Sequence, residues 1–250
     1  MSFMRGFKCG GNDRTKVKVA ICVLAGLERS GWVCPQLVNN LLTLVKDDRF
    51  DVHVHVMLAH SPVSYARNLS IVQAREQKAE WLLMIDNDQH FWTHTQPLDV
   101  LSAAGLGKEI IGFISMQGQK FGGYENGDMF IPNIRTLEPH DVDGDFFTVA
   151  RVGTGAMFIH HSVWESIAGP WFKEQIDPKS ELGAVDEETP GEDFYFCDLV
   201  RQHGFKVWAH AAIIPHLKTT EIATVGAQLK TLKQMAGQTN ARPPAKLEWK

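Results

Sequence analysis

The feature of this sequence that most constrains its fold is an apolar run that ends in two carboxylates. Residues 81–85 read WLLMI, and Asp86, Asn87 and Asp88 follow directly. A short continuous apolar run is typical of a strand that is buried on both faces of a sheet. Ligands of open α/β sheets bind beyond the carboxyl ends of such strands, and two aspartates there form a hard oxygen site for Mg2+ or Mn2+ and for the phosphates that these ions carry. The alternative interpretation is a turn held by Asx hydrogen bonds.

The first half of the chain predicts an α/β fold. We expect strands at residues 16–24, 51–57, 81–85 and 109–115. Between them we expect helices at residues 35–45, 62–78 and 97–104. Strands that alternate with helices favour a parallel sheet that is covered on both faces.

The second half is less regular. Residues 122–145 are rich in Gly, Asn, Asp and Pro and predict loops with short antiparallel strands. Further elements are expected as strands at residues 146–152, 156–160 and 205–209, and as helices at residues 162–168, 190–204 and 222–235. The helix at residues 190–204 has a predicted capping box, in which Thr189 is the N-cap and Glu192 its partner, with Pro190 as the first helical residue.

The composition is that of an ordinary globular protein. The chain has 250 residues, of which 44% are hydrophobic and 22% charged, and its formal net charge is -4. This charge provides no global basic field, which argues against coating of nucleic acid but not against a local basic patch. Widely spaced cysteines favour reduced thiols, and no apolar segment resembles a secretory signal or a membrane span. We therefore expect a cytoplasmic protein.

Two motifs in the second half are discarded. Asp141, Asp143 and Asp145 are spaced like the start of a calcium loop, but Phe146 stands where that loop needs glycine and Val152 where it needs a bidentate glutamate. We therefore expect a solvated turn. The Gly-Thr-Gly of residues 153–155 lacks the third glycine of a dinucleotide fingerprint, which argues against NAD binding.

Two segments remain as candidates beside the aspartates of residues 86–88. Glu192 and Asp193 lie at a predicted helix start, where a helix cap and a favourable interaction with the helix dipole would explain them without any catalytic role. His216 follows the strand expected at residues 205–209, and its alternative interpretation is an ordinary surface or core histidine.

The order of these motifs resembles glycosyltransferases of the GT-A fold, particularly the family 2-like enzymes. The resemblance covers about residues 17–219. It rests on the DxD of residues 86–88, VGTGAMFI at 152–159, GEDFYFCDL at 191–199 with GFKVW at 204–208, the later histidine, and Ala-Arg-Asn at 66–68. It implies a GT-A α/β/α sandwich with a mostly parallel central sheet. The chain departs from the pattern at Gln117, Lys120 and residues 122–145.

The resemblance also implies a function and a set of roles. It implies a hexosyltransferase of the EC 2.4 class that takes its sugar from a UDP- or GDP-sugar donor with the help of Mn2+ or Mg2+. Asp86, Asp88 and His216 would hold the metal ion, and the imidazole favours Mn2+. The residues implied for donor binding are Ala25, Leu27, Arg67, Asp86, Asn87, Thr154 and Gly155.

The resemblance assigns catalysis to residues 192 and 193. Asp193 would be the general base of an inverting transfer, and we expect its carboxylate to stay ionised because it lies at a helix N-terminus. Glu192 would hydrogen-bond the acceptor or the donor sugar. Retaining GT-A enzymes share the DxD and the histidine, so a retaining mechanism stays open.

We expect one catalytic domain. Its nucleotide-binding half would be residues 16–115 and its acceptor and catalytic half residues 116–220. It would be flanked by a flexible N-terminus at 1–15 and by a C-terminal helix and tail at 221–250. The polar, acidic residues 177–190 are expected to be a lid over the donor.

Two other classes of protein stay open. A sugar nucleotidyltransferase or phosphohydrolase also uses paired aspartates, but nucleotidyltransferases of similar architecture carry a Gly-rich basic loop where this chain has AGLER at residues 25–29. A non-catalytic sugar- or nucleotide-binding protein needs no acid–base carboxylate. The acceptor is undetermined: a glycan, a protein, a small molecule and a modified nucleic-acid base all fit.

Overall fold

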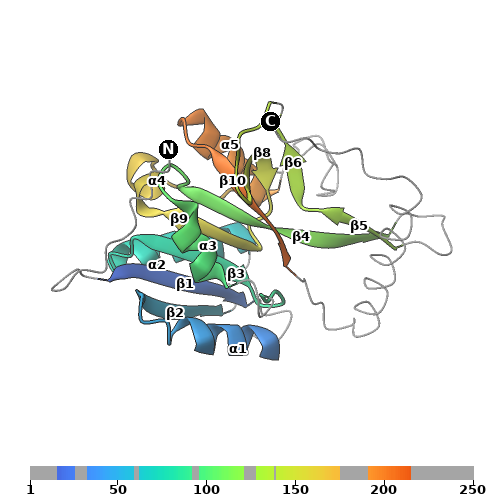
Figure 1. Ribbon diagram of the computed structural model, residues 1–250. Helices are drawn as coiled ribbons and strands as arrows, with labels where there is room; N and C mark the ends of the chain where they lie inside the picture. The colour runs from blue at the N-terminus through green and yellow to red at the C-terminus, as the bar shows by residue number, and fades with distance from the viewer. Residues whose placement is uncertain are drawn as a thin grey trace.

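The computed structural model describes residues 16–25, 33–58, 62–91, 96–120, 128–137, 139–174 and 191–214. These residues form a mixed α/β fold, in which one large sheet is covered by helices (Figure 1). Within this part of the chain, no helix has the length and apolar character to cross a membrane.

The elements follow the predicted order closely. The strands are β1 (Val17–Ala25), β2 (Phe50–Leu58), β3 (Trp81–Asp86), β4 (Ile110–Lys120), β5 (Asp128–Pro132), β6 (Ile134–Thr136), β7 (Val142–Asp143), β8 (Phe146–Val152), β9 (Ala156–His160) and β10 (Val207–Ile214). The helices are α1 (Pro35–Leu44), α2 (Val63–Glu76), α3 (Pro97–Ala104), α4 (His161–Ser166) and α5 (Glu192–Gln202).

The sheet is mixed, and the prediction of a mostly parallel sheet is wrong. Its strands lie in the order β2-β1-β3-β9-β4-β10-β8-β6. The pairs β1–β2, β1–β3 and β4–β10 are parallel, whereas β9 is antiparallel to both β3 and β4, and β8 is antiparallel to β10 and β6. The antiparallel strands therefore do not form a separate section, because β9 is inserted between β3 and β4.

The position of β9 has a physical reason. Its residues 156–159 are all buried, so this strand belongs in the centre of a sheet with neighbours on both edges. Its antiparallel direction places the start of β9 beside the end of β3, where Ile85 pairs with Ala156. The Thr154-Gly155 pair is thereby brought to the edge of the sheet where β1 and β3 end.

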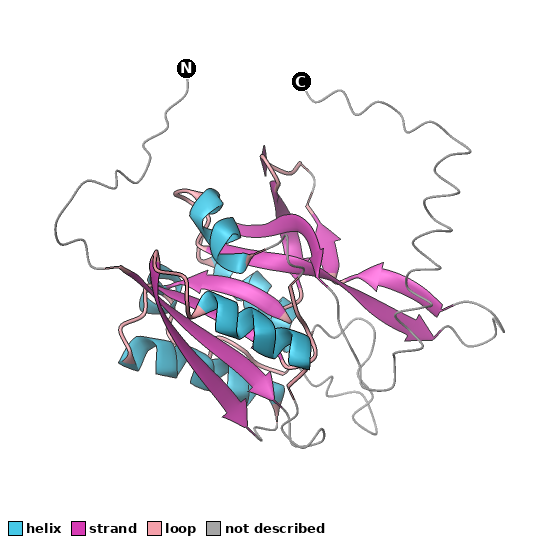
Figure 2. Cartoon of the chain, turned by 60° about the horizontal axis from the view of Figure 1, so that its bottom comes forward, coloured by secondary structure: helices cyan, strands magenta, loops and turns pink. Residues whose placement is uncertain are grey.

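Each face of the sheet has its own apolar core. On β1, Ala20 and Cys22 belong to the core that α2, α4 and α5 complete. Ile21 and Val23 face the opposite core, which α1 and α3 complete. Alternation along a strand between two buried faces is the pattern of an α/β/α sandwich. The second half of β4 leaves this sandwich and pairs with β5, so the two strands extend away from the helices (Figure 1, Figure 2).

The predicted capping box of α5 is wrong. The helix begins at Glu192, and its N-cap is Gly191, which provides no side-chain cap. Thr189 and Pro190 lie outside the described residues. Glu192 directly follows this N-cap, so it does not occupy the third helical position of a capping-box partner; its Oε1 instead accepts from Nε of Arg67 on α2, at 3.2 Å. The first turn of α5 is thus aligned by a tertiary ion pair.

Two smaller predictions are confirmed. Residues 141–145 are exposed around the β7–β8 turn, as expected of a solvated turn. Cys22, Cys34 and Cys197 are buried and free.

Candidate active site

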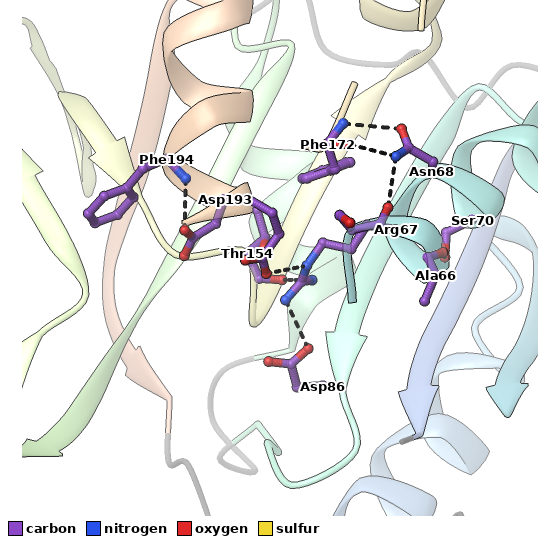
Figure 3. A network of polar contacts seen from close by, with 11 residues as sticks. Ala66, Arg67, Asn68, Ser70, Asp86, Thr154, Phe172, Asp193 and Phe194 are labelled. Carbon is purple, nitrogen blue, oxygen red and sulfur yellow. Dashed lines mark hydrogen bonds and ion pairs between the residues drawn. The ribbon is translucent and has the colours of Figure 1, made fainter. Parts of the chain in front are cut away.

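One buried guanidinium connects three separate segments of the chain. The side chain of Arg67, on α2, is only 5% exposed. Its Nη2 lies 3.4 Å from Oδ1 of Asp86, its Nε donates to Oε1 of Glu192 at 3.2 Å, and its Nη1 donates to the carbonyl oxygen of Thr154 at 3.0 Å (Figure 3). The DxD, Gly-Thr-Gly and Gly-Glu-Asp segments therefore meet at this side chain.

The charge of Arg67 is fixed by its partners. Burial alone would lower the pKa of the guanidinium, but Asp86, Glu192 and Asp193 together hold the pKa above its ordinary value. The Asp86 and Glu192 side chains remain 27% and 22% exposed. The site thus has one buried cation and carboxylates that reach the surface.

The residue after Arg67 holds α2 in place. Nδ2 of Asn68 donates to the carbonyl oxygens of Ser64 and Phe172, and its Oδ1 accepts hydrogen bonds from the backbone amides of Trp171 and Phe172 (Figure 3). Three of these contacts, between 2.7 and 3.1 Å, tie the first turns of α2 to the segment beyond α4, and the contact with Ser64 lies within α2. Asn68 is therefore a positioning residue for Arg67, a role that the sequence analysis did not assign.

Backbone hydrogen bonds fix the turn after β3. The amide of Asp86 donates to the carbonyl of Gly155 at 2.7 Å, and the amide of Asn87 donates to that of Leu24 at 3.1 Å. The carbonyl of Asn87 in turn accepts from the amide of Cys34, at the start of α1. Asn87 and Asp88 are buried, with Asp88 only 3% exposed, so Asp86 is the more accessible of the two aspartates.

Gly155 lies against a glutamine that the sequence analysis missed. A Cβ atom added to Gly155 would clash with the side-chain amide of Gln89, so a side chain at this position would require Gln89 to move. Within the described residues, Oε1 of Gln89 and Oγ1 of Thr154 are both buried and have no hydrogen-bond partner. Buried oxygens without donors are costly and uncommon, which makes both atoms candidate acceptors for ligand hydroxyls. The sequence offered one signal for Gln89, which is its position directly after Asp88.

Burial changes the acidity of Asp193. Its Oδ1 accepts a hydrogen bond from the amide of Phe194 at 2.7 Å. Burial, supported by the neighbouring Glu192, raises the pKa of the Asp193 carboxyl, although Arg67 opposes this shift. Loss of water thus shifts the pKa in the direction opposite to the effect expected from the helix N-terminus. An upward shift is in the direction that suits a general base.

The remaining predicted residues divide into two groups. Ala25 is buried at the end of β1, at the same sheet edge as Asp86. Leu27, His216, the proposed lid at 177–190 and the helix at 222–235 all lie outside the described residues. His216 follows the last residue of β10, Ile214, by two positions. Among the described residues, no three histidine, cysteine or acidic side chains gather as metal ligands do.

Comparison with solved structures supports the fold. The chain resembles A197 from STIV, with a TM-score of 0.51 and 16% sequence identity over 80% of this chain and 85% of that one. At this identity the likeness is one of fold.

Two further neighbours are more distant. GalNAc-T7, crystallised with UDP, GalNAc and Mn2+, has a TM-score of 0.46 and 13% identity over 82% of this chain and 45% of its own. A glycosyltransferase involved in glycosylation of the major capsid of PBCV-1 has a TM-score of 0.35 and 12% identity over 77% of this chain and 91% of that one. No protein-family model and no curated protein sequence matches the chain.

Proposed function

We propose that the protein is a glycosyltransferase of the GT-A type, which moves a sugar from a UDP- or GDP-sugar to an acceptor hydroxyl by an inverting reaction. The observation that carries this proposal is the Arg67 network. It brings Asp86, Thr154 and Glu192, which come from three of the motifs on which the sequence resemblance rests, to one place at the sheet edge where β1 and β3 end. Ligands of α/β sheets bind at this edge.

The donor would lie across the ends of β1, β3 and β9. Ala25 and Leu27 would contact the base, and Asp86 and Asn87 the ribose and diphosphate. The sugar ring would lie near Thr154 and Gly155, where the Gln89 side chain fills the space that a side chain at Gly155 would need. The unpartnered oxygens of Thr154 and Gln89 would accept hydrogen bonds from the sugar hydroxyls. Residues 16–115 would then be the nucleotide-binding half of one catalytic domain that extends to residue 220.

Two carboxylates and an imidazole suit Mn2+ or Mg2+. The Asp86 side chain is 27% exposed, so a cation could reach its carboxylate. Asp88 and His216 would complete the protein ligands. Such an ion would neutralise charge on the departing nucleoside diphosphate.

Asp193 would take the proton from the acceptor. As the acceptor oxygen forms its bond to the anomeric carbon, the bond from that carbon to the diphosphate oxygen breaks, and the hydroxyl proton passes to the Asp193 carboxylate. Glu192, which is paired with Arg67, would orient the reacting sugar or acceptor. This division gives the two adjacent carboxylates different tasks, because Glu192 forms an ion pair with the Arg67 guanidinium, whereas Asp193 accepts a hydrogen bond from the amide of Phe194.

A donor screen tests the proposal directly. UDP-, GDP- and dTDP-sugars are each added with Mn2+, and binding is followed by thermal shift and turnover by mass spectrometry of the released nucleoside diphosphate. We expect one nucleotide series to stabilise the protein and to release diphosphate. Release of pyrophosphate from a sugar phosphate and a nucleoside triphosphate would instead establish a nucleotidyltransferase.

A further inference from the structure

A second cluster of charges lies on the other side of Asp193 from Arg67. Arg135 on β6 pairs directly with Arg151 on β8 in the antiparallel register. Both guanidinium groups lie over the ring of Phe194, with their Cζ atoms 5.7 and 5.6 Å from its centroid. Phe194 follows Asp193 in the first turn of α5, and its ring points away from the Arg67 network (Figure 3).

The cluster has more positive than negative charge. Asp198, one turn further along α5, accepts hydrogen bonds from Nε and Nη2 of Arg151 at 3.0 and 2.7 Å. Arg201 reaches the same carboxylate at 3.9 Å. Arg135 has no carboxylate within ion-pair distance among the described residues; its guanidinium donates only to the carbonyl of Ile134, at 3.2 Å. Two guanidinium groups, of Arg151 and Arg201, thus share the Asp198 carboxylate, and the third, of Arg135, has no acidic partner among the described residues.

This arrangement has a cost that an anion would remove. Like charges placed directly opposite each other on paired strands destabilise the sheet. The planar guanidinium is suited to paired hydrogen bonds with carboxylates and phosphates. The donors are accessible, since Arg135 is exposed and the side chains of Arg151 and Arg201 are 35% and 36% exposed. Stacking on Phe194 holds the two opposed groups in fixed positions.

We propose that Arg135 and Arg151, supported by Phe194, bind an oxyanion carried by the acceptor, either a phosphate or a carboxylate. The site would anchor an acidic acceptor beside Asp193, with its hydroxyl presented to that carboxylate. The role of the anion as part of the acceptor rests on the proposed glycosyl transfer. Anion binding itself does not, because the arginines and the ring are present whatever reaction occurs.

Anion titration tests the binding step without donor or acceptor. Inorganic phosphate and, in a second arm, glucuronate are added at constant ionic strength, with sodium chloride as the balancing salt, and affinity is measured by thermal shift and by NMR of the arginine Nε–H groups. We expect Arg135→Gln to weaken binding of the preferred anion by roughly tenfold or more, since hydrogen bonds to charged groups contribute strongly. The two arms distinguish a phosphate from a carboxylate.

A matched control exists in Arg75→Gln. Arg75 is also exposed and also lies over an aromatic ring, that of Trp171 at 6.0 Å, but in the described part of the chain no second guanidinium shares that ring. This variant should bind the anion like the unmodified protein, and Arg135→Lys should bind it more tightly than Arg135→Gln. Equal weakening in Arg75→Gln and Arg135→Gln, or unchanged binding in Arg135→Gln, would overturn the site.

A kinetic experiment separates this inference from the proposed function. Once the donor screen has provided a transfer assay, the preferred anion should inhibit competitively against the acceptor. Competition against the nucleotide-sugar would overturn the acceptor role and assign the arginines to the donor diphosphate. If no transfer occurs with any donor but the anion still binds through Arg135, the proposed function fails while the anion site stands.

Discussion

Nε of Arg67 lies 3.2 Å from Oε1 of Glu192, and this contact joins residues that are 125 positions apart in the chain. It orients the start of α5, on which Asp193 lies, relative to α2 and the end of β3. The same guanidinium approaches Asp86. Arg67 therefore contacts both Asp86, which is proposed to bind the donor, and Glu192, which is proposed to take part in catalysis. Substitution of Arg67 should therefore change stability and activity together.

Arg67→Met should destabilise the protein, because Asp86 and Glu192 would lose their common counter-charge. Removing one partner of a fully buried ion pair costs about 3–5 kcal/mol, and the cost here should be smaller since both carboxylates are about a quarter exposed. Urea denaturation gives the change in the free energy of unfolding. Arg75→Met on the exposed side of the same helix is the control; an equal loss in both variants would contradict a special role for Arg67.

The sequence predicted the elements of this site better than their arrangement. Strand and helix patterns are local, so β3, α3, β8 and β9 were placed almost to the residue. The direction of β9 is not encoded in its own apolar run, because burial on both faces is compatible with either a parallel or an antiparallel neighbour. The sheet was for that reason expected to be mostly parallel.

Side-chain contacts between distant segments also could not be predicted from the sequence. The DxD and Gly-Glu-Asp motifs were recognised, but nothing in their spacing indicates that Arg67 connects them. The positioning role of Asn68 was missed for the same reason, since its partners Trp171 and Phe172 lie more than 100 positions away. The raised pKa of Asp193 depends on burial by the tertiary fold, whereas the helix N-terminus was the only local signal.

Asp193→Asn should stabilise the protein at neutral and higher pH. Burial raises the pKa of Asp193 in the folded state. The contribution of this carboxyl group to stability is therefore greatest below its pKa in the unfolded chain, and it falls as pH rises through its pKa in the folded protein. Asparagine carries no charge to bury, so it should remove this loss. The comparison uses the melting temperatures of the variant and of the unmodified protein from about pH 4 to pH 8, which is roughly the range in which carboxyl groups with a raised pKa titrate. If the difference in melting temperature between the variant and the unmodified protein does not grow as pH rises, the Asp193 carboxylate is not a buried charge.

Thr154→Val should leave stability unchanged or raise it, because Oγ1 of Thr154 is buried without a partner among the described residues. The variant should at the same time weaken binding of the nucleotide-sugar more than binding of the nucleoside diphosphate alone. Thr148→Val is the matched control: Thr148 is also buried, but its Oγ1 accepts a hydrogen bond from the amide of Asp141 at 2.8 Å. The control should lose about 0.5–1.5 kcal/mol of unfolding free energy. Equal destabilisation of the two variants would mean that Oγ1 of Thr154 has a partner in the native protein.

Removal of the metal ion should weaken nucleotide binding. Calorimetry with UDP and GDP, with Mn2+ or with EDTA, measures the difference, and His216→Ala should reduce it because the imidazole is a proposed ligand. Asp88→Asn should act in the same direction. His203→Ala, on an exposed histidine at the end of α5, controls for loss of an unrelated imidazole. Identical affinities with and without the metal ion would remove the divalent cation from the mechanism.

Asp193→Asn should retain binding of the donor and the metal ion while losing turnover. The side chain keeps nearly the same shape and can still accept a hydrogen bond from the amide of Phe194, but it cannot take the acceptor proton. Loss of a positioned base should lower the rate by roughly 10²–10⁴-fold, with the Kd of the nucleoside diphosphate little changed. Glu192→Gln provides the contrast, since its effect should come with a loss of the ion pair to Arg67 and hence with lower stability. The anomeric configuration of the product, read by NMR against that of the donor, decides the mechanism: inversion agrees with Asp193 as the base, whereas retention would remove Asp193 from that role and indicate a retaining enzyme on the same fold.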